Sequence, residues 1–121
     1  MTRRDAEEIA GLLPLPEAVF HILVALADDE RHGYAIIQEV GSRTGGAVRL
    51  SAGTLYRSVQ RMQEQGLIQE SRRRPAPEED DERRRYYLLT EFGAAVARAE
   101  ARRLTQLVKF ARESGFAPEK A

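Results

Sequence analysis

The sequence contains no cysteine, no tryptophan and only two histidines. Without thiols the chain forms no disulfide, no thiolate metal site and no cysteine nucleophile, and this composition suits a reducing compartment. Two histidines, His21 and His32, are too few for an ordinary histidine zinc site. The sequence also shows no serine–histidine or carboxylate–histidine constellation of the kind that enzymes use. We therefore expect no metal, no cofactor and no enzymatic activity.

Long apolar runs and an excess of charge of one sign are absent as well. No apolar run approaches the ~20 residues that a membrane-spanning helix needs. The N-terminal segment is too charged for a secretory signal, so we expect a cytoplasmic protein without a membrane partner. The 121 residues suit a single domain. Nineteen basic and nineteen acidic side chains give a net charge of zero, so only local clusters of charge can attract a polyanion.

The stretch from Ser51 to Gly66 predicts one helix with two chemically different faces. Leu55, Val59 and Met62 recur at the spacing of a buried stripe. Ser51 suits the N-cap position and Gly66 suits the stop. No acidic residue occurs from Ser51 to Met62, and hydroxyl and guanidinium groups recur on the opposite side. A helix with these two faces suits a nucleic acid. The residues of its polar face are Thr54, Arg57, Ser58 and Arg61.

The following stretch, residues 67–90, predicts a β-hairpin. Its second arm ends in the strand-forming run 86–89, and between the arms lie two prolines and the acidic run 78–82, which cannot continue a packed strand. Arginine triplets at 72–74 and 83–85 border this interruption. Antiparallel pairing brings the triplets together beside the preceding helix. A basic-faced helix followed by an arginine-flanked hairpin predicts a winged helix-turn-helix.

Apolar periodicity predicts three helices before the one at Ser51, covering residues 1–13, 16–27 and 33–45. Prolines and glycines separate these segments. The helices that begin at Gly33 and Ser51 would be the two limbs of the helix-turn-helix. Residues 48–50 suit a minimal strand against the hairpin. The expected fold class is therefore mainly α with a two-stranded β-wing.

A long alanine-rich helix is predicted after Thr90, its N-cap, as far as about Ser114. It has one apolar side with Phe92, Val96, Ala99 and Leu107, and a seam spaced 4, 3, 4, 3 on another side. A helix packed wholly on its own domain is the alternative, but its length favours a homodimer. We thus expect a DNA-binding domain at 1–90, including the N-terminal helix, and a dimerisation helix at 91–121. The predicted interface residues are Phe20, Ala97, Ala101, Leu104, Val108 and Ala111.

Three stretches in order resemble the PadR family of transcriptional regulators. They are LVALADDERHGYAIIQEV, SAGTLYRSVQRMQEQGLI and RRRYYLLTEFG, of which G-T-L-Y followed by R-M and G-L-I is the most specific. The resemblance extends from Leu15 to the end, and the single terminal helix is similar to the short form of the family. It implies a winged helix-turn-helix homodimer on an inverted-repeat operator, usually a repressor. Many members release DNA when they bind a small aromatic or amphipathic effector.

The resemblance also bears on the residues that contact DNA. The N-terminus of the helix at Ser51 should approach phosphate. Tyr34 and Tyr56 each have two interpretations. Each is either a half-buried tyrosine with a purely structural role or a tyrosine whose hydroxyl contacts a phosphate. Arginines at the base and middle of the hairpin are candidates for contacts with the DNA backbone. The complete predicted set is Tyr34, Ser51, Ala52, Gly53, Thr54, Tyr56, Arg57, Ser58, Arg61, Arg72, Arg73, Arg84 and Arg85.

An alternative function is a winged-helix module that binds another protein and never contacts DNA. The zero net charge favours it. The acidic run 78–82 also favours the protein-binding module, because phosphates would repel these carboxylates. It departs from the family pattern, in which the wing tip usually touches the minor groove. Salt-dependent retention on duplex DNA separates the two functions.

Overall fold

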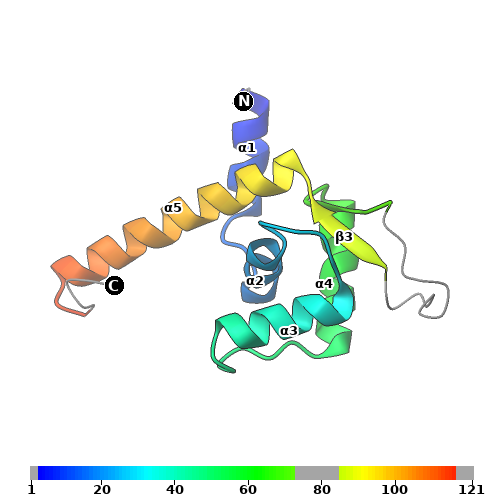
Figure 1. Cartoon of the computed structure of the whole chain (residues 1–121). Helices are drawn as coiled ribbons and strands as arrows, with labels where there is room; N and C mark the ends of the chain where they lie inside the picture. Colours follow the sequence, from blue (N-terminus) through cyan, green and yellow to red (C-terminus); the bar gives the residue numbers. More distant parts are fainter. Residues whose placement is uncertain (1–2, 73–84, 117–121) are drawn as a thin grey trace.

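The computed structural model describes residues 3–72 and 85–116, which form a mainly helical fold with a small antiparallel sheet (Figure 1). The predicted fold class is therefore confirmed. None of the helices in these two ranges is long and apolar enough to cross a membrane. In chain order the elements are α1 (Arg3–Leu12), α2 (Glu17–Ala25), β1 (Arg31–His32), α3 (Gly33–Arg43), α4 (Ala52–Glu64), β2 (Ile68–Glu70), β3 (Tyr86–Leu89) and α5 (Glu91–Glu113).

The sheet has three strands rather than two, in the order β1-β3-β2. Tyr87 of the middle strand lies opposite Arg31 on one side and Glu70 on the other. The expectation of a strand at residues 48–50 is wrong, because these residues have no strand conformation. The segment directly before α3 takes that place, and its backbone groups satisfy the edge of β3 that the wing alone would leave unpaired.

The core is built around α2, which packs against α3, α4 and α5 (Figure 1). Ile22 and Leu23 of α2 are fully buried in the same cluster as Ile36 of α3. The predicted stripe of α4 is also buried, with Leu55 and Met62 at its centre. Burial of one complete side fixes the rotation of α4 about its axis, and so determines which residues it presents to solvent.

Side-chain caps start three of the helices. Ser51 Oγ accepts a hydrogen bond from the Thr54 amide at the start of α4, and Thr90 Oγ1 accepts one from the Gly93 amide at the start of α5. Both caps are predicted from the sequence and confirmed. The third cap is His32, whose Nδ1 accepts from the Ala35 amide at 3.1 Å and begins α3. Capping satisfies amides that the first helical turn leaves without a partner.

The start of α5 rests directly on the turn that ends α4. Gly66 forms that turn with a φ of 76°, a conformation that glycine adopts without strain. Thr90 Oγ1 donates to the Gly66 carbonyl at 2.6 Å, and the Thr90 amide donates to the Leu67 carbonyl at 3.1 Å. A Cβ at Gly93 would lie 2.0 Å from the Leu67 carbonyl oxygen. The two backbones meet this closely only because residue 93 has no side chain.

A buried carboxylate fastens the connection between α1 and α2 to the middle of α5. Glu100 is 2% exposed. Its Oε2 accepts from the Leu15 amide at 2.9 Å, and its Oε1 accepts from Arg103 Nε at 2.5 Å. The hydrogen bond from Arg103 lowers the pKa of Glu100, and the Leu15 amide adds to this effect, although burial opposes it.

Candidate nucleic-acid interface

The helices α3 and α4 pack against each other as the limbs of a helix-turn-helix (Figure 1). Thr44, just after α3, holds the connection between them. Its Oγ1 donates to the Val40 carbonyl at 2.8 Å and accepts from the Val48 amide at 3.1 Å. The connection is therefore anchored to the end of α3, and it delivers the chain to the N-cap of α4 at Ser51.

The first two turns of α4 present a connected group of polar side chains. Arg57 is exposed, and its guanidinium donates to Thr54 Oγ1 at 3.5 Å. Ser51 Oγ donates to the same oxygen at 3.1 Å. Arg57 also lies over Gly53, where a Cβ would come within 3.2 Å of its Nη1. Ala52 and Gly53 are exposed and Ser58 is half-buried, so the helix N-terminus and the guanidinium share one accessible surface.

Arg61 lies in different surroundings from Arg57, although both are exposed on the polar side of α4. It lines a hollow together with Leu12 at the end of α1 and with Pro14 and Pro16 of the connection between α1 and α2. The structure thus places one arginine beside the N-terminus of α4 and the other beside the N-terminal part of the chain. A ligand that contacts both must extend along at least one turn of the helix.

Two tyrosines flank the first turn of α3. Tyr34 is 56% exposed, and its ring stacks on His32 with centroids 6.5 Å apart. Tyr56 is half-buried, and its hydroxyl oxygen would lie 2.7 Å from a Cβ at Gly33. Tyr56 therefore lies between α4 and the start of α3, while Tyr34 presents its ring to solvent.

In the wing, Tyr87 of β3 is buried in the same core cluster as Leu55 of α4. Its burial raises the pKa of the phenol, and the neighbouring Tyr56 and Glu70 raise it further. Tyr87 therefore remains uncharged around neutral pH and belongs to the core of the wing.

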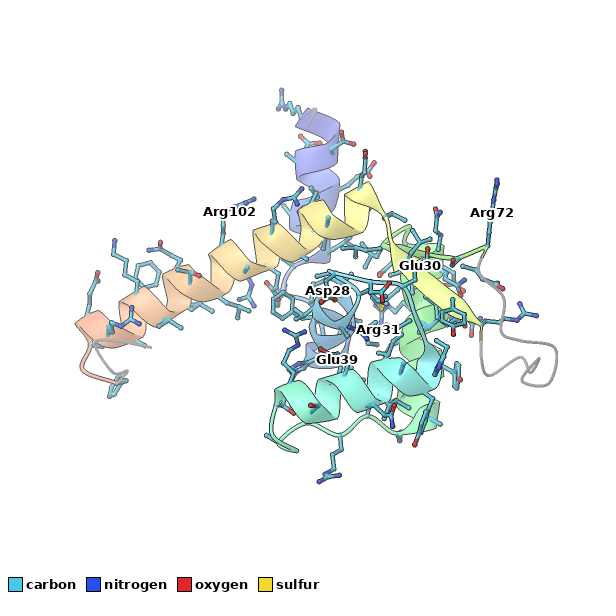
Figure 2. The ribbon with its side chains drawn as sticks, viewed as in Figure 1. Asp28, Glu30, Arg31, Glu39, Arg72 and Arg102 are labelled. Atoms are coloured by element: carbon cyan, nitrogen blue, oxygen red, sulfur yellow. The ribbon has the colours of Figure 1, made fainter. Side chains whose placement is uncertain are left out.

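The structure places two of the four predicted wing arginines. Arg72 is exposed just after β2, and Figure 2 shows its side chain pointing away from α3. Arg85 is half exposed and pairs with Glu70 at 3.3 Å; such surface pairs contribute little stability, ~0–1 kcal/mol. Arg73 and Arg84 lie outside the described residues, as does the acidic run 78–82.

The predicted dimer residues divide between the core and the surface. Phe20 and Ala111 are half-buried, Ala97 packs against the core, and Ala101 is exposed. Farther along α5, Leu104 and Val108 are exposed, as are Leu107 and Phe110. Leu107 belongs to the other predicted apolar side, whose residues Val96 and Ala99 are buried or half-buried nearer the start of α5. The buried residues of α5 lie in its first half, and Figure 1 shows its C-terminal part extending beyond the other helices.

Two further exposed polar residues, which the sequence patterns did not single out, lie near the predicted site. Gln60 lies one turn after Arg57 on α4, and a glutamine can read adenine through two hydrogen bonds. Its spacing of three from Arg57 is a signal that could have identified it. Arg49 precedes the N-cap of α4, and its guanidinium lies near Gly46, 3.0 Å from where a Cβ would be. No periodic pattern marks Arg49, because it lies in a connection.

Residues 22–99 match the transcriptional regulator PadR-like family. A transcriptional regulator from Clostridium thermocellum has the same fold, with 21% identity, 89% of this chain and 94% of that chain covered, and a TM-score of 0.66. A PadR family transcription regulator from Clostridium difficile has 23% identity over 81% of this chain and 97% of its own, with a TM-score of 0.65. Bacillus subtilis PadR, solved in complex with operator DNA, has 19% identity over 71% of this chain and 47% of its own, with a TM-score of 0.61. No curated protein sequence matches this chain.

Proposed function

The chain belongs to the PadR-like family of transcriptional regulators, and we propose from this that it binds double-stranded DNA sequence-specifically as a homodimer and represses transcription. The observation that carries the proposal is the exposed face of α4. Arg57 and Arg61 are exposed there, no acid precedes Glu64 in the helix, and the opposite side is buried. A rigid helix with such a face suits the major groove of B-DNA.

Each part of the site has a proposed role. Thr54, Arg57, Ser58 and Arg61 face the bases, where an arginine reads guanine through its O6 and N7 atoms. The N-terminus of α4 approaches phosphate, because its amides and the helix dipole favour an anion. Tyr34 adds a phosphate contact from α3. The remaining proposed contacts with the DNA backbone come from Ser51, Ala52, Gly53, Tyr56, Arg72, Arg73, Arg84 and Arg85.

The proposed homodimer forms through the second half of α5. Leu104, Leu107, Val108 and Phe110 are exposed, and burying apolar surface of this kind is worth roughly 25 cal/mol per Å². A two-fold dimer places the two copies of α4 on the half-sites of an inverted repeat. In this division residues 1–90 bind DNA and residues 91–121 dimerise.

We also propose that a small aromatic effector releases the dimer from DNA. The exposed rings of Phe110 and Phe116 on and after α5 supply apolar surface for such a compound near the dimer axis. Release requires that the effector bind the DNA-incompetent dimer more tightly, by ~1–3 kcal/mol. A regulator of this kind, with no cysteine, suits the reducing cytoplasm.

Selection of bound sequences from a pool of random duplexes tests the proposed function. We expect the recovered sequences to share an inverted repeat, and their affinity to fall steeply with salt because phosphate contacts release counterions. A chain that retains no duplex at low salt would instead support the protein-binding module. Effector binding is tested separately, by the effect of planar aromatic compounds on melting temperature and on affinity for the selected duplex.

A further inference from the structure

The turn before β1 is hydrogen-bonded to the far edge of the sheet. Glu30, in this turn, accepts a hydrogen bond at its Oε1 from Ser71 Oγ at 2.5 Å, although the two residues are 41 positions apart. Ser71 is 4% exposed and Glu30 is half-buried. A buried hydroxyl needs a partner, and a hydrogen bond to a carboxylate is among the stronger ones. This hydrogen bond therefore fixes the position of Ser71 relative to Glu30.

The contact spans the whole width of the sheet. Glu30 immediately precedes β1, Ser71 immediately follows β2, and β3 lies between these two strands. The Ser71 amide also donates to the Tyr86 carbonyl at 2.8 Å, so Ser71 continues the pairing of β2 by one residue. The Glu30–Ser71 hydrogen bond thus ties the two outer strands together, and we call it the strap.

The Glu30 end of the strap is itself fixed to the helices. Arg31 Nε donates to the Ala25 carbonyl at the end of α2 at 2.7 Å. The same guanidinium lies 3.4 Å from Asp28 and 3.9 Å from Glu39 of α3. Figure 2 shows Asp28, Glu30, Arg31 and Glu39 gathered where α2, α3 and the sheet meet. Through these contacts the strap connects the helix-turn-helix to the arm of the wing.

We propose that Glu30 is a positioning residue for DNA binding. It holds Ser71, and so fixes the backbone that carries Arg72 just after β2. Glu30 does not itself contact DNA, since its carboxylate would be repelled by phosphate and is engaged by Ser71. The inference rests on the proposed function, because it assigns the strap a role in presenting Arg72 to the DNA backbone.

A double-mutant cycle tests the strap against a duplex selected with the wild-type chain. Ser71→Ala should weaken binding by about tenfold and reduce the salt slope by about one phosphate contact. Arg72→Ala should give the same loss, and the double variant should bind no more weakly than Arg72→Ala alone. Glu30→Gln keeps an oxygen acceptor and should restore most of the affinity that Glu30→Ala loses. Gln69→Ala, an exposed change on the same strand, is the matched control and should bind like wild type.

Three outcomes would overturn the proposed positioning role of the strap. If the fold-loss in DNA affinity of the double variant equalled the product of the losses of Ser71→Ala and Arg72→Ala, Ser71 would not act through Arg72. An unchanged salt slope in Ser71→Ala, with only a lower melting temperature, would reduce the contact to a purely structural role. Equal losses in Glu30→Gln and Glu30→Ala would exclude the hydrogen bond as the cause. Failure of the wild-type chain to bind any duplex would overturn the proposed function instead, and the positioning role with it.

Discussion

Replacing Glu100 should destabilise the protein more than any exposed change on the same helix. Glu100→Ala removes a buried carboxylate that accepts from the Leu15 amide and from Arg103. Hydrogen bonds to charged groups contribute ~1.5–3 kcal/mol each. The Arg103 side chain is 34% exposed and can regain water, so its share is discounted. The amide of the half-buried Leu15 is left without its acceptor. We expect a loss of about 2–4 kcal/mol in the free energy of unfolding.

Glu100→Gln separates the charge from the hydrogen bond to the linker. The amide oxygen can still accept from Leu15, so we expect a loss of only about 1 kcal/mol. Because the folded pKa of Glu100 lies below its ordinary value of 4.5, the stabilisation from its charge is fully present above that pH. It is lost as the pH falls through the lowered pKa. The difference between wild type and Glu100→Gln should therefore be constant near neutrality and shrink on acidification.

Thermal and urea unfolding at fixed protein concentration measure these differences, since association would make melting depend on concentration. For a domain of this size, 1 kcal/mol corresponds to about 4 °C in Tm. Arg102→Ala is the matched control, because Figure 2 shows Arg102 projecting from α5 into solvent, and it should stay within about 0.5 kcal/mol of wild type. If Glu100→Ala lost no more stability than this control, or if the difference from Glu100→Gln did not change down to about pH 2, the argument would be refuted.

Three further perturbations have expected outcomes. Arg57→Ala or Arg61→Ala should weaken binding to a selected duplex by ~1–3 kcal/mol with little change in Tm. A variant that bound this duplex as tightly as wild type would show that the replaced arginine is not part of the site. Leu104→Glu should convert a homodimer to monomer, as sedimentation measures, because each buried charge would meet its own copy; a monomeric wild type would end this interpretation. Gly93→Ala should cost several kcal/mol, because its Cβ would overlap the Leu67 carbonyl, whereas Gly11→Ala, with nothing within 4 Å, should be neutral or stabilising.

Most of the helical framework could be predicted because its signals are local. The caps at Ser51 and Thr90 and the stop at Gly66 depend on a few adjacent residues, and the stripe of α4 repeats within one helix. Strand β1 could not be predicted, because its two residues, Arg31 and His32, have no strand pattern of their own. They are strand only because the edge of β3 lies beside them.

The side-chain environment of the site was harder to predict than its position on the helix. The polar face of α4 follows from the spacing of its residues. The different surroundings of Arg57 and Arg61 do not, because the fold brings the connection between α1 and α2 beside Arg61 alone of the two. Burial of Glu100 has the same origin, since an isolated glutamate on a helix is ordinarily exposed and only the fold brings the Leu15 amide to it.

The junction between α5 and the end of α4 has a mechanical consequence. Thr90 binds the carbonyls of Gly66 and Leu67, and Gly93 brings the backbones into contact there, so α5 has little freedom to pivot at its base. The helix has 23 residues and is roughly 35 Å long, comparable with the ~34–36 Å between successive major-groove faces. A molecule that binds the C-terminal end of α5 therefore acts on a long, stiff lever. Because the base is held to the turn that ends α4, moving the far end by roughly 6 Å, about one helical turn, would require α5 and that turn to rotate together by about 10°.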